Sequence, residues 1–148
     1  MELVRSSELF FYELIAKSKK RNNINTNEFV DVYLVKLLDS IALGENRFIT
    51  KDSLSLLYLQ AYQTNNHKEF RIVGDSCLLL LGFFPSQSIE SFRTLYRSIG
   101  ISSYDFLQEQ IYRILASEFD GAVHLLLGAH AMLQGDNVTS LFAWNTKI

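Results

Sequence analysis

The chain has 148 residues, of which 48% are hydrophobic and 20% charged, and its formal net charge is −2. This length and composition argue against disorder and predict one domain with a substantial core. The charge offers no concentrated basic surface, so we expect no nucleic-acid partner. One cysteine excludes an internal disulfide and a cysteine-rich zinc site, and we expect no metal and no cofactor. No apolar run approaches the roughly 20 residues of a membrane span, and no signal peptide is recognisable, so we expect a cytoplasmic protein.

Three helices are predicted in the first part of the chain. Residues 2–20 carry apolar side chains at helical spacing and end in a cluster of lysines, which suits the negative end of a helix dipole. Asn25 and Glu28 have the spacing of a capping box, and Gly44 stands where the helix that they open would end. A third helix is predicted over 51–64.

The central element is a helix over about 67–84. Asn66 and Glu69 repeat the capping-box spacing at its start. Pro85, the only proline, fixes its end, because the residue before a proline is pushed out of the helical region. The stretch is apolar on all sides, which is typical of a helix buried in the middle of a bundle. We therefore expect the other helices to pack around it.

The second half of the chain continues the helical pattern. Helix resumes near Glu90 and extends to about Ser117, with Gly100 as either a break or a close helix crossing. Asp120 is predicted to be the N-cap of a last core helix over about 121–134.

No stretch alternates apolar and polar residues as a half-buried strand does. The sequence therefore predicts an all-α protein, a single irregular bundle of six or seven helices around the buried central helix. We expect one domain over 1–148, in which 135–148 form a short C-terminal helix or a tail. The third helix is expected to turn Tyr62 inward, and the residues expected in the core are Leu54, Leu57, Phe70, Val73, Leu80, Leu81, Phe84, Tyr104, Leu107 and Ile111.

Asp75 lies within the most apolar stretch of the sequence, so we expect it to be buried. A buried carboxylate needs a hydrogen-bond donor or an opposite charge nearby. Arg71, one helical turn earlier, is the first choice as that partner. The other candidates lie on the segment that follows: Arg93, Tyr96, Arg97 and Tyr104. Two interpretations stay open, a polar fastener between helices and a carboxylate of shifted pKa in a binding pocket.

Ser76 is the only candidate nucleophile that a motif suggests. The run Gly-Asp-Ser-Cys-Leu resembles the start of the GDSL hydrolase signature, with Ser76 as the nucleophile. That chemistry needs a strand, a tight turn that exposes the serine, and a distant histidine. Here a helix is predicted on both sides, and Asp120 and His124 are one residue too far apart for the later Asp-x-x-His. The pattern therefore favours a protein without a catalytic residue.

A wider set of motifs covers most of the chain. It consists of Tyr33-Leu34-Val35-Lys36-Leu37-Leu38, Val73-Gly74-Asp75, Gly82-Phe83-Phe84-Pro85, and then Tyr96, Gly100 and Tyr104. In this order they resemble a family of small helical bacterial proteins of unknown function. Leu95 departs from that pattern, where a second tyrosine is common, and so does Asp120, where a proline often follows Phe119. The resemblance implies a helical fold and brings no activity with it.

Three functions are compatible with these patterns. The first is a non-enzymatic helical interaction or regulatory module, with a protein partner or self-association as a homo-oligomer. The second is a protein that binds a small apolar ligand between helices, with a polar anchor near Asp75. The third is a hydrolase that uses Ser76. The lack of a catalytic constellation and the abundance of apolar and aromatic side chains favour the first.

Overall fold

The computed structural model describes residues 6–45, 51–85 and 90–135. These residues form seven α-helices and one short 3-10 helix, and no strand occurs among them. The elements are α1 (Ser6–Arg21), α2 (Glu28–Ala42), α3 (Lys51–Thr64), α4 (His67–Gly82), η2 (Glu90–Phe92), α5 (Arg93–Leu107), α6 (Gln110–Ser117) and α7 (Phe119–Gly135). The all-α prediction, with six or seven helices, is confirmed. No helix in the described ranges is long and apolar enough to cross a membrane.

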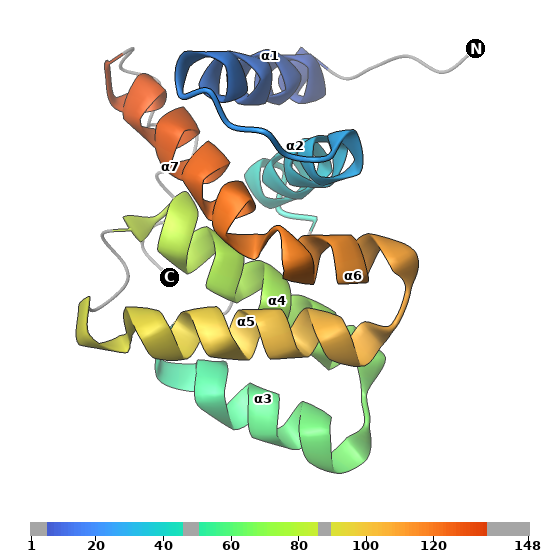
Figure 1. Ribbon diagram of the computed structural model, residues 1–148. Coiled ribbons are helices and arrows are strands. Elements are labelled where there is room, and N and C mark those ends of the chain that lie inside the picture. The colour runs from blue at the N-terminus through green and yellow to red at the C-terminus, as the bar shows by residue number, and fades with distance from the viewer. Residues whose placement is uncertain (1–5, 46–50, 86–89, 136–148) are drawn as a thin grey trace.

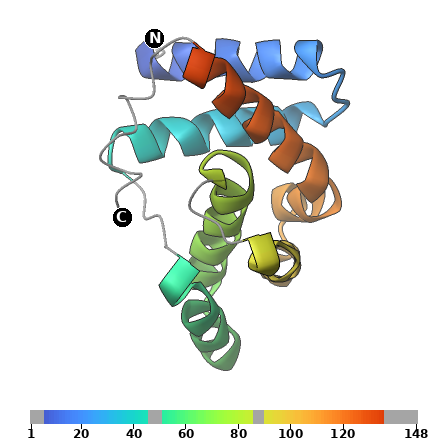
Figure 2. The same cartoon turned by 90° about the vertical axis from the view of Figure 1, so that its left-hand side faces the viewer.

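The helix α4 lies at the centre of the arrangement (Figure 1). It packs on α5 along much of its length and also contacts α3 and α7. All residues from 72 to 82 are buried, so α4 is enclosed on every side, as the sequence predicts for the central helix. The helices α1 and α2 run side by side above it, and α7 contacts α1 as well as α4 (Figure 2).

Polar caps explain where several helices begin and end. The side chain of Asn66 accepts a hydrogen bond from the backbone N–H of Glu69 at 3.1 Å, which confirms the cap predicted for the central helix. That helix ends at Gly82, as the position of Pro85 predicts. Gly44 has φ of 71° just after α2, the left-handed conformation that ends many helices. The prediction that Asn25 caps the start of α2 is wrong, because the side chain of Asn27 makes this cap.

The second half of the chain departs from the prediction at two points. The helix expected to reach Ser117 breaks at Gln108, which has φ of 66° and separates α5 from α6. No glycine or proline marks this break. Asp120 does not cap α7, because α7 already begins at Phe119. Gly100 is a close crossing, since a Cβ atom there would lie 2.7 Å from Cζ of Phe119.

The predicted core agrees closely with the observed one. All ten residues expected in it are buried except Leu57 and Ile111, which are partly buried against its edge. The prediction that Tyr62 turns inward is wrong, because its side chain is 61% exposed. The expectation for the C-terminal segment falls on 136–148, outside the described residues.

Candidate functional site

Asp75 is held by two tyrosine hydroxyl groups in the middle of the protein. Only 4% of its surface is exposed. Tyr33 from α2 and Tyr104 from α5 each donate a hydrogen bond to the same carboxylate oxygen, Oδ1, at 2.7 Å. The prediction of a buried, partnered carboxylate is confirmed, with Tyr104 among its partners. The first choice, Arg71, is wrong as a hydrogen-bond partner, and Tyr33 was not foreseen.

Glycines on both helices allow Tyr104 to approach Asp75. A Cβ atom on Gly74 would lie 2.7 Å from the ring carbon Cε1 of Tyr104, so only glycine leaves room for that ring. One turn before the tyrosine, a Cβ atom on Gly100 would lie 2.9 Å from Cβ of Cys77 on α4. The two helices therefore cross closely at these positions. The Gly-Asp motif and the Gly-x-x-x-Tyr motif are in direct contact with each other.

A third tyrosine completes an aromatic cluster around the carboxylate. The rings of Tyr104 and Tyr112 are stacked, with centroids 5.9 Å apart and planes at 15°. Tyr33 stands edge-on to both, with centroid distances of 6.4 Å to Tyr104 and 6.0 Å to Tyr112. The edge-on contacts are favourable because the positive edge of one ring meets the negative face of another, and a stacked pair is favourable when its rings are offset. The rings thus hold one another in position, and with them the two hydroxyl donors.

Burial dominates the ionisation of this cluster. It raises the pKa of Asp75 from its ordinary value of 3.8 to about 6, against the opposing effects of the Tyr104 and Tyr33 hydrogen bonds and the positive charge of Arg71. Burial and the charge of Asp75 raise the pKa values of Tyr33 and Tyr104 well above the usual range. Both tyrosines therefore stay protonated and keep donating.

A pocket of about 210 Å³ opens beside the carboxylate, between α2 and α4. Its lining residues are Tyr33, Lys36, Leu37, Ser40, Arg71 and Asp75. All of these except Leu37 carry a polar or charged group. Arg71 is half-buried at its rim.

The remaining predicted site residues lie elsewhere. Arg97 makes a bidentate ion pair with Asp120 on α7, with N–O distances of 2.7 and 2.9 Å. This pair lowers the pKa of Asp120. Arg93 donates a hydrogen bond to the backbone carbonyl of Leu81 near the end of α4, at 3.1 Å. Tyr96 is buried with its ring 6.2 Å from that of Phe92. None of these three side chains, Arg93, Tyr96 and Arg97, reaches Asp75. The predicted site residues therefore lie in different parts of the structure.

The structure offers no support for catalysis by Ser76 or Cys77. Both lie in the middle of α4 and are fully buried. Ser76 thus lacks the strand and exposed turn that a nucleophilic serine needs. Burial raises the pKa of the Cys77 thiol, which keeps it protonated and unreactive. Within the described ranges, no group of three or more His, Cys, Asp or Glu residues is placed to hold a metal ion.

Comparison with protein-family models, with curated proteins and with solved structures finds no match to this chain.

Proposed function

We propose that this protein is a non-enzymatic interaction module that binds an amphipathic helix of a partner protein in the groove between α1 and α2. The observation that carries the proposal is a pair of hollows in this groove, of about 430 and 240 Å³. Tyr12 and Val35 border both hollows, and Leu9 and Val32 line the larger one. We call these four residues, with the space between them, the α1–α2 groove.

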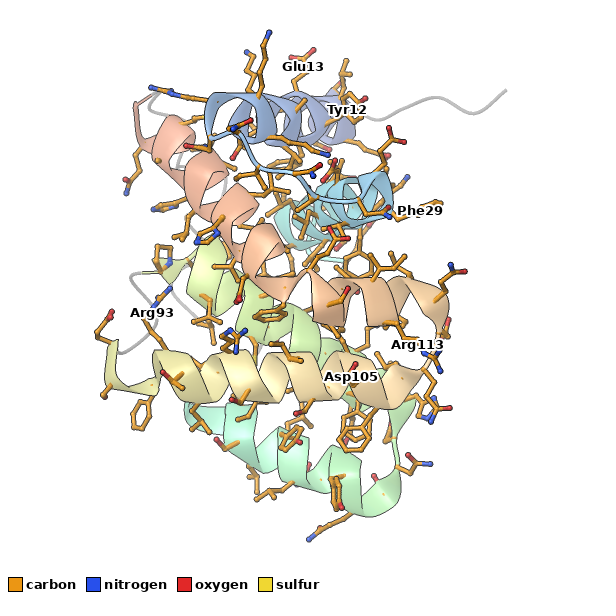
Figure 3. All side chains as sticks on the ribbon, viewed as in Figure 1. Tyr12, Glu13, Phe29, Arg93, Asp105 and Arg113 are labelled. Carbon is orange, nitrogen blue, oxygen red and sulfur yellow. The ribbon has the colours of Figure 1, made fainter. Side chains whose placement is uncertain are left out.

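Large apolar side chains are exposed along this groove. Leu9 is 51% exposed, Tyr12 58% and Val32 47%. Phe29, one turn before Val32 on α2, is 65% exposed but lines neither hollow. Figure 3 shows Tyr12 and Phe29 at the outer edge of the two helices. A contiguous apolar patch on a protein surface marks an interaction site more often than isolated residues do. Apolar side chains are exposed on α3 as well, yet they line neither hollow.

Two ion pairs support the shape of the groove. At one end Lys36 of α2 lies 2.7 Å from Glu8 of α1, and at the other Lys19 of α1 lies 2.6 Å from Asp31 of α2. Lys19 also donates to the carbonyl oxygen of Thr26 at 2.7 Å. Because these contacts connect α1 to α2 and its preceding loop, the groove is formed before a partner arrives. Preformed sites lose less conformational entropy on binding.

The charges along the groove indicate the kind of helix that fits it. Three lysines, Lys19, Lys20 and Lys36, line the hollows against two carboxylates, Glu8 and Asp31. Lys20 is exposed at the end of α1. A helix that places apolar residues at positions i, i+3 and i+7 in the groove, with acidic residues beside Lys20, would complement both the shape and the charge.

The proposal includes a cytoplasmic setting in a bacterial cell. The resemblance of the motifs to small helical bacterial proteins supports the bacterial part. A single, buried cysteine, in a chain without a disulfide framework, suits a reducing compartment.

The test uses two designed helical peptides of 16 residues, the length of α1, titrated into the isotopically labelled full chain. Both carry the same leucine stripe, flanked by glutamates in one peptide and by lysines in the other. We expect the acidic peptide to bind more tightly and to shift backbone amide resonances along α1 and α2. Shifts confined to α3 and α5, or tighter binding of the basic peptide, would overturn the proposal. A dimer of the free protein that Leu9→Ser dissociates would assign the groove to a second copy instead.

A further inference from the structure

Three charged residues line the pocket between α2 and α4: Lys36, which pairs with Glu8, and Arg71 and Asp75, which form no ion pair with each other. Asp75 and Arg71 both line it, four residues apart on the same face of α4. Such spacing places side chains next to each other on a helix surface, which normally allows an ion pair. Here the described residues include no ion pair or hydrogen bond between Arg71 and Asp75. The positive charge still acts on the carboxylate through space, because it lowers the pKa of Asp75 against the effect of burial.

The carboxylate of Asp75 has one oxygen that accepts neither tyrosine hydrogen bond. Both tyrosine hydroxyls donate to Oδ1, and no donor from the described part of the chain is placed on Oδ2. An ionised carboxylate accepts about four hydrogen bonds when it is fully satisfied. Asp75 is 96% buried and lines the pocket, so it retains acceptor capacity that a ligand can use.

Arg71 offers the complementary capacity. It is half-buried at the pocket rim and donates no hydrogen bond to any residue that the structure describes. A guanidinium group presents five N–H donors in a planar fork, which matches the two oxygens of a carboxylate. The pocket thus presents Arg71, which can bind an anionic group, and Asp75, which can bind a cationic group, one helical turn apart.

We propose that this pocket binds a small zwitterion of amino-acid size, with its carboxylate on Arg71 and its ammonium group on Asp75. The volume of about 210 Å³ corresponds to roughly seven water molecules, which suits a small amino acid. This site shares Lys36 with the larger hollow of the α1–α2 groove, but Arg71 and Asp75 line neither hollow of the groove. The inference therefore does not rest on the function proposed above.

The choice of a carboxylate at this position supports the proposal. An asparagine would accept hydrogen bonds from both tyrosines without the cost of burying a charge. The raised pKa of Asp75 shows that its tyrosine partners do not offset that cost. An ammonium group bound to Oδ2 would offset the cost of burying this charge. Groups with such a shifted pKa are common at binding sites.

The experiment titrates the twenty common amino acids into the labelled full chain and follows the backbone amides of Leu37 and Ser40. We expect at least one amino acid to produce saturable shifts. For that amino acid, analogues that lack either the ammonium or the carboxylate group should bind at least about tenfold more weakly. No saturable shift with any amino acid, or equal binding of the analogue without the ammonium group, would overturn the proposal.

Variants locate the site within the protein. We expect binding to weaken at least about tenfold in each of two variants, Arg71→Gln and Asp75→Asn. The Asp75→Asn variant keeps a side-chain oxygen that accepts the hydrogen bonds of both tyrosines. Arg113→Gln, which removes an exposed arginine on α6 (Figure 3), is the matched control and should leave binding unchanged. Unaltered binding by Arg71→Gln would refute the assignment. Leu9→Ser should not affect this binding, which separates the result from that of the groove.

Discussion

Replacing Asp75 with asparagine should remove one source of pH dependence from the stability of the protein. The amide keeps a carbonyl oxygen for the hydroxyl groups of Tyr33 and Tyr104, but it has no proton to lose. In the parent protein, burial raises the pKa of Asp75 from 3.8 to about 6. One pKa unit corresponds to 1.36 kcal/mol, so ionisation of this residue costs the folded state about 3 kcal/mol relative to the unfolded chain.

The sign of the effect follows from the direction of the shift. Because the folded-state pKa lies above the unfolded one, the contribution of Asp75 to stability is fully present below pH 4. It is lost as the pH rises through about 6. The asparagine variant should therefore gain up to about 3 kcal/mol of unfolding free energy relative to the parent between pH 4 and pH 8.

Urea unfolding followed by circular dichroism, at steps between pH 4 and pH 8, measures this difference. Other titrating groups are present in both proteins and cancel in the comparison. Asp120→Asn is the matched control, since the pKa of Asp120 is lowered by its ion pair with Arg97. Its contribution is lost only as the pH falls below the usual range of a carboxyl group. A difference between Asp75→Asn and the parent that stays constant from pH 4 to pH 8 would refute the reasoning.

Three further substitutions test the packing around α4, each by urea unfolding at pH 7. Tyr104→Phe removes a hydroxyl donor from a buried carboxylate and should cost about 1.5–3 kcal/mol, and an unchanged stability would mean that this hydrogen bond is not formed. It should also raise the pKa of Asp75 further, so that the pH-dependent loss of stability extends to higher pH. Gly100→Ala places a methyl group 2.7 Å from the ring of Phe119 and should cost about 1–3 kcal/mol, whereas a gain in stability would contradict the close crossing. Leu81→Ala should cost about 2–5 kcal/mol because Leu81 is buried on α4, and a loss below about 1 kcal/mol would contradict its core position.

Local sequence signals located the helices well where a cap or a breaker was present. Asn66 and Pro85 mark the two ends of α4, and Gly44 marks the end of α2, because each acts through its own backbone geometry. The break at Gln108 could not be foreseen, since a glutamine has no intrinsic preference for positive φ. The helices α5 and α6 contact each other on either side of this residue, and such a tertiary contact is not visible in the sequence.

The burial of Asp75 could be predicted from its neighbours, but only part of its hydrogen bonding could. Helical spacing favoured Arg71, yet this long side chain lines the pocket half-buried and forms no hydrogen bond with Asp75. Tyr104 could be foreseen as a candidate from the next segment. Tyr33 is 42 residues away in the sequence, and only the packing of α2 beside α4 brings its hydroxyl to Oδ1.

The groove between α1 and α2 had only a weak signal in the sequence. The helical patterns around Tyr12 and Val32 predicted amphipathic helices, but periodicity alone does not show which apolar positions stay uncovered. That information depends on how α1 and α2 pair, which the ion pairs of Lys19 with Asp31 and of Lys36 with Glu8 fix. Both pairs join residues far apart in the chain.

The affinity of the acidic helical peptide for three forms of the protein tests the proposed function most directly. The forms are the parent, Leu9→Ser in the groove, and Leu59→Ser on α3; the two leucines are matched, at 51% and 54% exposed. Fluorescence anisotropy should show binding weakened about tenfold or more by Leu9→Ser, because this side chain lines the groove, and unchanged by Leu59→Ser. Equal affinities for all three forms, or a loss confined to Leu59→Ser, would contradict the account.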